Sequence, residues 1–236
     1  MRRLLFVLAC WIAASSNLLA QGPTAEDAIK SYGLNKKKSS LDVFTFGYNV
    51  DMLANAPADM NLSYRSGGIS LAFYFNQRLG KSNFSIAEGI GLSSRNYFQD
   101  YAFWGNNLTA ASPYSQGELD TVVTKNKLVI TTLDVPIEFR YTSKKLGKKK
   151  TVLKAAVGVT MNLNLDAMKK TVFESGETVK VKGTSDLKNV NTFRAALHAR
   201  LAINKIGVSM TYSLVPLFKE PALQVTPWSI GLQLVL

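Results

Sequence analysis

Charged side chains recur two or four positions apart in two segments of the chain that are predicted to be β-strands, and a third such segment carries one. Residues two apart on a strand point to the same face, so acids and bases of neighbouring strands could meet. The candidate network consists of Asp134, Glu138, Arg140, Lys154, Arg194, His198 and Arg200. It could be an ion-paired plug, a proton or ion path, or a small-ligand site. Because acids and bases occur together, we predict the plug and keep the other two as alternatives.

His198 is the only histidine of the chain. Histidine is well suited to acid–base catalysis near neutral pH. Alternation, however, places His198 on the same face as Arg194 and Arg200, which favours a structural or pH-sensitive role. The acids are too scattered for a metal-binding loop, and no phosphate-binding loop occurs. The sequence therefore predicts no catalytic residue, no metal, no cofactor and no enzyme activity.

A long polar segment at 98–118 carries several aromatic residues among Asn and Ser. Exposed aromatic rings with adaptable polar neighbours suit recognition surfaces. The candidates for extracellular recognition are Phe98, Tyr101, Phe103, Trp104 and Tyr114. The alternative is that these rings pack over the end of the fold.

The elements that position these residues are eight segments in which large apolar residues alternate with Gly, Ser, Thr, Asn or charged residues. Such alternation is typical of strands with two different faces. The segments exceed the common strand length of about 5–6 residues and match the roughly 9–11 residues of a strand that crosses a membrane. They are residues 42–52, 68–78, 83–94, 128–141, 152–165, 193–203, 206–214 and 228–236.

The connections between these segments alternate in length. Short links at 79–83, 143–150 and 204–205 alternate with longer links at 53–66, 97–126 and 166–189. Short turns at one end and longer loops at the other are typical of outer-membrane barrels. We therefore predict an all-β fold: an eight-stranded antiparallel up-and-down transmembrane β-barrel that spans residues 41–236.

The composition of the polar face indicates which way the strands point. It is rich in Gly, Ser, Thr, Ala and Asn, whereas a solvated face would carry more Lys and Glu. The apolar face is therefore predicted to face lipid, and a soluble periplasmic barrel is the alternative. Glu88 falls on the lipid face, which a bulge, an interfacial position or a partner would explain. Pro136 predicts a kink or bulge.

The N-terminus has the order of a secretory signal peptide: Arg2 and Arg3, an apolar run, and small residues up to Ala20. We predict cleavage after Ala20, with residues 21–40 as a periplasmic linker. A lipoprotein site at Cys10 is the alternative. The net charge is +12. Its lysine runs, at 36–38 and 143–150, lack interleaved aromatics, so anionic lipid headgroups are predicted as partners rather than nucleic acid.

Several stretches together resemble the PorT-like outer-membrane β-barrel proteins of Bacteroidetes. They are LANAPADM at 53–60, FNQRLGKSNFSIAEGIGLSS at 75–94, NKLVITTLDVPIEFRY at 126–141, FRAALHARLAI at 193–203 and MTYSLVPLF at 210–218. The most specific parts are LGKSNFSIAEGIG and the Leu-Asp-x-Pro-x-Glu pattern at 133–138. The resemblance covers about residues 41–236. It implies an eight-stranded outer-membrane barrel and, for the PorT member, a role in a secretion system that exports proteases and gliding adhesins.

Taken together, the residues and the resemblance predict a non-enzymatic protein of the cell outer membrane. It would be a structural or accessory component, with a link to protein secretion implied by the resemblance. Its predicted partners are outer-membrane lipids and secretion-system or other envelope proteins. The alternative function is a narrow channel or a small-ligand-binding outer-membrane protein.

Overall fold

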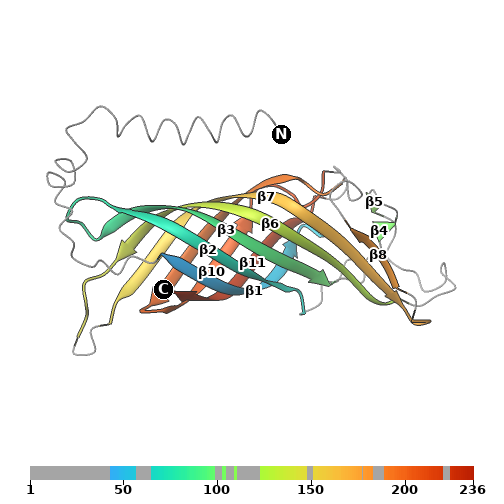
Figure 1. Cartoon of the computed structure of the whole chain (residues 1–236), viewed down its shortest axis with the longest axis horizontal. Helices are drawn as coiled ribbons and strands as arrows, with labels where there is room; N and C mark the ends of the chain where they lie inside the picture. The colour runs from blue at the N-terminus through green and yellow to red at the C-terminus, as the bar shows by residue number, and fades with distance from the viewer. Residues whose placement is uncertain are drawn as a thin grey trace. The chain divides into compact units, whose positions relative to one another are not determined.

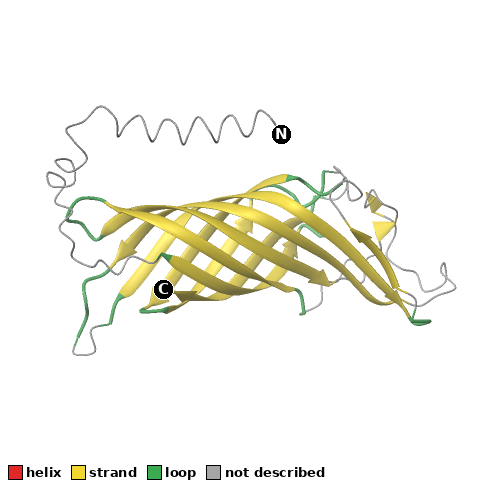
Figure 2. Ribbon diagram, viewed as in Figure 1, coloured by secondary structure: helices red, strands yellow, loops and turns green. Residues whose placement is uncertain are grey.

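The computed structural model describes residues 43–56, 65–98, 103–104, 109–110, 123–147, 151–176, 178–182, 189–219 and 224–236. All of them belong to one compact unit, Leu41–Leu236. The predicted signal peptide at 1–20 and linker at 21–40 lie outside the described residues. Every regular element in the described part of the chain is a β-strand (Figure 2). No helix among these residues is long and apolar enough to cross a bilayer.

The predicted eight-stranded antiparallel up-and-down barrel is confirmed. Each barrel strand pairs with the next one along the barrel, and pairing of β6 with β7 closes the sheet (Figure 1). Closure leaves no open sheet edge around the wall. The barrel strands are β1 (Phe44–Ala54), β2 (Gly67–Arg78), β3 (Phe84–Phe98), β6 (Val123–Thr142), β7 (Leu153–Phe173), β9 (Phe193–Ile203), β10 (Ile206–Ser213) and β11 (Thr226–Val235).

Two barrel strands are longer than the alternation predicts. β6 has 20 residues and β7 has 21, and both continue past the ends of their neighbours on the long-loop side. There β7 also pairs with β8 (Thr178–Lys182), which is not part of the barrel wall. Register shifts in the β6–β7 ladder at Val123/Lys125 and Thr131/Thr132 mark bulges in this region. A separate two-stranded ladder joins β4 (Phe103–Trp104) to β5 (Thr109–Ala110).

Of the kink or bulge predicted at Pro136, the bulge is wrong. The register between β3 and β6 is the same on both sides of Pro136, as the pairs Glu88–Ile137 and Gly91–Asp134 show. Proline lacks an amide hydrogen, so it interrupts the ladder without adding a residue to it. Gly89 makes room, because a Cβ atom there would lie 3.0 Å from the Pro136 ring.

The outer wall of the barrel is apolar and exposed on all eight strands. Phe75, Ile206 and Leu232 expose 72%, 68% and 64% of their surfaces. Their alternate neighbours on the inner face are polar and buried, such as Thr45, Ser93 and Thr226. The distribution is therefore the reverse of that in a water-soluble barrel, where the apolar side chains fill the interior.

Aromatic rings gather at the short-turn end of this wall. The rings of Phe84 and Phe139 stack with centroids 5.3 Å apart, and Tyr141 lies 5.3 Å from Phe84. On the neighbouring strands, Phe44 and Phe73 pair at 4.9 Å. Aromatic residues at this level are typical of the interfacial girdles of membrane barrels.

Glu88 lies on the outer wall. It pairs with Phe75 on one side and Ile137 on the other, without a register shift in either ladder, and its side chain is exposed. A bulge that turns this carboxylate inward is therefore excluded. An interfacial position and a contact with a partner remain as the two explanations.

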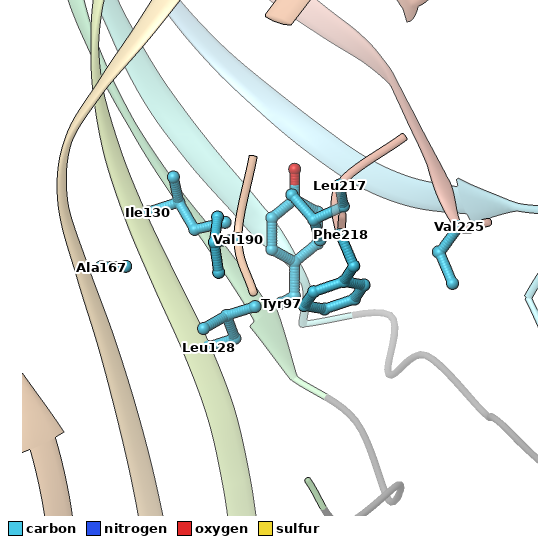
Figure 3. Close-up of a cluster of buried hydrophobic side chains, with 8 residues drawn as sticks. All are labelled: Tyr97, Leu128, Ile130, Ala167, Val190, Leu217, Phe218 and Val225. Atoms are coloured by element: carbon cyan, nitrogen blue, oxygen red, sulfur yellow. The ribbon is translucent and has the colours of Figure 1, made fainter. Parts of the chain in front are cut away.

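An apolar cluster fills the barrel mouth at the long-loop end (Figure 3). We call it the mouth cluster. It combines inward-facing residues of β3, β6 and β7 with residues of the loops before β9 and after β10: Tyr97, Leu128, Ile130, Ala167, Val190, Leu217, Phe218 and Val225.

Backbone hydrogen bonds hold the two loops of the mouth cluster together. The amide of Asn191 donates to Leu217 O at 2.9 Å, and that of Lys219 donates to Asn189 O at 2.8 Å. The side chain of Asn191 also donates to the carbonyls of Pro216 and Phe218. The barrel is thus capped by its own loops at this end.

Candidate functional site

The inner face carries a compact group of charged side chains around Glu138. Glu138 on β6 and His198 on β9 stand in one cross-strand row, with Gly158 of β7 between them. Two inter-strand spacings separate their Cα atoms by about 10 Å, since neighbouring strands lie about 4.8 Å apart. The side chains meet because Gly158 has none: a Cβ there would lie 2.9 Å from Cε1 of His198.

The next inward-facing row repeats this arrangement. Arg140 and Arg200 flank Ala156, the small residue of β7 at this level. Both guanidinium groups turn towards the carboxylate of Glu138. Arg140 Nε donates to Glu138 Oε2 at 2.5 Å, and Arg200 Nη2 donates to the same oxygen at 2.8 Å.

The second carboxylate oxygen of Glu138 has two partners. Tyr74 on β2 donates its hydroxyl to Oε1 at 2.9 Å, and His198 Nε2 lies 2.9 Å from the same atom. The guanidinium carbon of Arg140 also lies 4.0 Å from the centre of the Tyr74 ring, within cation–π range. We call Tyr74, Glu138, Arg140, His198 and Arg200 the Glu138 cluster.

Burial makes these contacts energetically important. Glu138 exposes 2% of its surface, Arg140 3% and Arg200 6%. A buried charge without a partner is costly, whereas one that is paired and hydrogen-bonded can be accommodated. The Glu138 cluster therefore holds three charged side chains inside the barrel through mutual contacts.

A second polar group lies nearer the mouth. Asp134 Oδ1 accepts hydrogen bonds from Asn162 Nδ2 at 2.6 Å and from Thr132 Oγ1 at 2.7 Å. In the same region, Arg95 Nη1 donates to Asp51 Oδ1 at 2.5 Å and to Ser229 Oγ at 3.0 Å. These contacts link β1, β3 and β11 on one side of the lumen and β6 and β7 on the other.

The structure brings four of the seven predicted network residues into direct contact: Glu138, Arg140, His198 and Arg200. Asp134 and Arg194 share another row, separated by Asn162. Lys154 is half-buried in the row that lies one step closer to the short turns than Arg140. The seven residues are thus distributed over four levels of the lumen rather than gathered in one network.

Three important lumen residues were absent from the predicted set. Tyr74 and Asp51 both fall on the polar face of the predicted strands. Most residues on that face are small, so the large ring of Tyr74 and the isolated acid of Asp51 could have identified them as site residues. Arg95 was missed because the predicted strand ended at Ser94, whereas β3 continues to Phe98. A strand boundary that is wrong by a few residues can hide a site residue.

His198 also contacts a hydroxyl group. Thr160 Oγ1 lies 3.0 Å from His198 Nδ1, so a hydroxyl, an imidazole and a carboxylate follow one another, as in a hydrolase triad. In a working triad the carboxylate orients the histidine and stabilises its protonated form. The carboxylate of Glu138 is instead shared with two arginines and a tyrosine. The Thr160 side chain is half-buried and lines the lumen cavity. The arrangement is therefore suited to ordering side chains rather than to attacking a substrate.

A cavity of about 70 Å³ lies between the Glu138 cluster and the second polar group. Its wall includes two acids and two arginines, Asp134, Glu138, Arg95 and Arg200, together with hydroxyl groups such as those of Ser209 and Thr211. That volume is enough for a few water-sized species, since one water needs about 10–15 Å³ by this measure. The cavity is too small for a peptide, a sugar or a lipid.

The aromatic recognition candidates are only partly described. Phe98 ends β3, and Lys127 Nζ lies 5.6 Å from the centre of its ring. Phe103 and Trp104 form β4. Tyr101 and Tyr114 lie outside the described residues, so the extracellular recognition role stays a prediction. Within the described ranges, no three His, Cys, Asp or Glu side chains are grouped so that they could hold a metal ion.

Comparison with known proteins gives little beyond the fold. No family model matches the chain, and no curated protein matches it. Among solved structures, that of Ail, the attachment invasion locus protein of Yersinia pestis, is similar over 83% of this chain and 97% of that chain. The TM-score is 0.38 and the sequence identity is 12%. At this level the likeness carries no functional inference.

Proposed function

We propose that the chain is an outer-membrane barrel protein that works as a closed, non-enzymatic scaffold. The observation that carries this proposal is the inside-out distribution of side chains on a closed barrel. A barrel satisfies all its backbone hydrogen bonds within the wall, which is the condition for strands to cross a bilayer. An outer wall of exposed Phe, Leu, Ile and Val side chains suits lipid and would be a liability in water.

The filled lumen supports a closed scaffold over a channel. An eight-stranded barrel is just wide enough for its own side chains to fill. Here the Glu138 cluster occupies the lumen near the short turns, and the mouth cluster covers the other end. A path for ions would have to break both.

The channel alternative is tested by recording from purified protein in planar bilayers, together with fractionation of the cell envelope. We expect the protein in the outer-membrane fraction and no discrete conductance steps. Regular single-channel steps from the wild-type protein would refute the closed scaffold. Recovery in the soluble periplasmic fraction would instead refute the membrane assignment.

We further propose that the protein acts through its ends, as an accessory component of protein secretion. The resemblance to PorT-like proteins supports this link. The short-turn end supports an interaction there, because its described turns carry exposed cations such as Lys81, Lys144 and Lys205. Such turns suit anionic lipid headgroups and acidic faces of envelope proteins.

Co-purification tests the secretion link. A tagged chain would be extracted from membranes in mild detergent, and a variant with Lys81, Lys144, Lys145 and Lys205 changed to Gln would serve as the comparison. We expect envelope proteins of one secretion machine to be retained by the wild type and reduced in the variant. Normal secretion in a deletion strain would contradict the accessory role.

A further inference from the structure

We propose that a group of lysines on the outer face of the long-loop end binds the phosphate groups of a glycolipid of the lipid A class in the outer leaflet. The group consists of Lys127, Lys170, Lys180 and Lys182, and we call it the lysine row. The inference rests on the proposed function, because it requires the barrel to cross the outer membrane with its long loops outside.

The strand registers place these lysines opposite one another. Lys127 of β6 pairs with Lys170 of β7, and Lys170 pairs with Lys180 of β8, which lies beside β7 beyond the barrel wall (Figure 1). Residues in register on neighbouring strands project from the same face, so three ammonium groups start from positions that span about 10 Å. Lys182 lies two residues further along β8 and therefore on the same face.

This face is the outer one. Leu128, the neighbour of Lys127 on β6, belongs to the mouth cluster and is buried on the inner face. Lys127 is half-buried on the opposite face, where its Nζ lies 5.6 Å from the centre of the Phe98 ring, and Lys180 and Lys182 are exposed. The lysine row therefore faces the surroundings of the barrel rather than its lumen.

The arrangement favours a bound anion. Like charges directly opposite one another on neighbouring strands destabilise the pairing, and the lysine row contains two such pairs. The described acids nearest to Lys170 along the chain, Asp166 and Glu174, are each four residues away. The described ladder positions directly beside the row include no acid; they are Val129, Met168, Val172 and Thr178. An external anion would therefore stabilise the pairing of β7 with β8.

The height of the lysine row indicates a lipid headgroup. Tyr141, in the aromatic group at the short-turn end, and Lys127 face outward on the same strand, 14 residues apart. With a rise of about 3.3 Å per residue and a tilt of about 40°, the row lies roughly 35 Å above Tyr141 along the barrel axis. The apolar band of such barrels is about 25 Å tall, and a bilayer with its headgroups is about 40–45 Å thick. The row thus lies in the headgroup layer of the outer leaflet.

The surface around the row fits a phosphorylated lipid better than free phosphate. Lysine binds phosphate as a point charge, and strands about 4.8 Å apart allow one phosphate to contact two ammonium groups. Closer to the membrane centre, the outer face of β6 and β7 carries Leu133 beside Leu163, which suits acyl chains. A glycolipid can use both surfaces at once, whereas inorganic phosphate can use only the lysines.

Native mass spectrometry tests the ligand class. The full chain would be refolded in detergent micelles and titrated with lipid A, with dephosphorylated lipid A and with inorganic phosphate. We expect retention of lipid A, much weaker retention of the dephosphorylated form, and no displacement by millimolar phosphate. Equal retention of both lipids would show that acyl chains alone hold them, and displacement by phosphate would show a site for free ions. Either result would overturn the proposal.

Paired substitutions test the lysines themselves. Lys170→Gln/Lys180→Gln should weaken lipid A binding about 30-fold, since each lysine near an anionic surface contributes roughly fivefold. Lys170→Arg/Lys180→Arg keeps both charges and should retain binding. Arg65→Gln/Lys219→Gln removes two charges from exposed residues of the same end and should also retain it. Unchanged binding by the first variant, or an equal loss in the last, would contradict the lysine row as the site.

Amide hydrogen exchange provides a second readout. Lipid A should slow exchange in β8 of the wild type, because the bound phosphate reduces repulsion between β7 and β8, and should leave β8 of Lys170→Gln/Lys180→Gln unchanged. Wild-type exchange in β1 would show that the variant is folded. If the wild type fractionates with the outer membrane but lipid A leaves exchange in β8 unchanged, the lysine site is refuted while the proposed scaffold stands.

Discussion

Glu138 and His198 touch across an intervening strand, with their side chains 2.9 Å apart over Gly158. The contact requires a small residue on β7 at that level, and Ala156 has the same role for the two arginines in the next row. The charged lumen is thus built as much by the small residues of β7 as by the charged ones of β6 and β9.

Replacement of Glu138 by Ala should destabilise the barrel strongly. It leaves Arg140 and Arg200 buried without their shared carboxylate, and removal of one partner of a buried pair costs about 3–5 kcal/mol. Thermal and urea unfolding in micelles would measure the loss. Glu174→Ala, at an exposed turn after β7, is the matched control and should change little. An unchanged melting temperature with a new conductance would show that Glu138 gates a pore instead.

Replacement of Gly158 by Ala should separate Glu138 from His198. The new methyl group would clash with the backbone oxygen of Ile137 and lie 2.9 Å from the His198 ring and from the Cα of Glu138. Overpacking of this kind costs about 1–3 kcal/mol. Unfolding gives the energetic effect, and the imidazole resonances in NMR spectra report the lost contact. Ala155→Val, on the outer wall of the same strand, should leave the His198 resonances in place.

Replacement of Phe218 by Ala should weaken the cap over the barrel mouth. Phe218 exposes 1% of its surface, and loss of such a ring from a packed core costs about 3–5 kcal/mol. We expect faster cleavage of the chain at 189–192 and 214–219 by added protease and a lower melting temperature. Phe75→Ala on the outer wall serves as the control. Wild-type protease resistance of Phe218→Ala would mean that other contacts hold the cap closed.

Replacement of Glu88 by Leu distinguishes the two remaining explanations of this outward carboxylate. In bare lipid, an acid on the outer wall is unfavourable by an amount that depends on depth, below the roughly 2–4 kcal/mol of a basic residue at the midplane. Equilibrium unfolding from phospholipid vesicles should therefore show that the variant is as stable as the wild type or more stable. If the wild type instead co-purifies with another protein from native membranes and Glu88→Leu does not, the carboxylate contacts that partner.

The fold could be predicted from the sequence because each barrel strand is amphipathic along its whole length. Alternation of two faces fixes strand identity, and the small residues of the polar face indicate a crowded interior. The charged side chains of the lumen could also be predicted from the sequence, since every charge of the Glu138 cluster lies on the predicted inner face. Which of these side chains contact one another was harder to predict, because contacts such as Tyr74–Glu138 depend on the registers of several strand pairs at once.

Other features depend on interactions that local patterns do not contain. The extensions of β6 and β7 lack the strict alternation of the wall, so their length was underestimated. The bulges occur at Val123/Lys125 and Thr131/Thr132 rather than at Pro136, where Gly89 relieves the steric conflict. The mouth cluster draws Val190 and Phe218 from loops whose sequences resemble ordinary turns.

The mouth cluster also has a consequence for the order of assembly. It combines residues that are far apart along the chain, from Tyr97 to Val225, and it exists only where β3, β6 and β7 already stand side by side. Contacts between such distant segments form late in folding, after the entropy of closing the intervening loops has been overcome. Until then, Leu217 and Phe218 are exposed on an unfinished chain. Their burial marks the moment at which the barrel has closed.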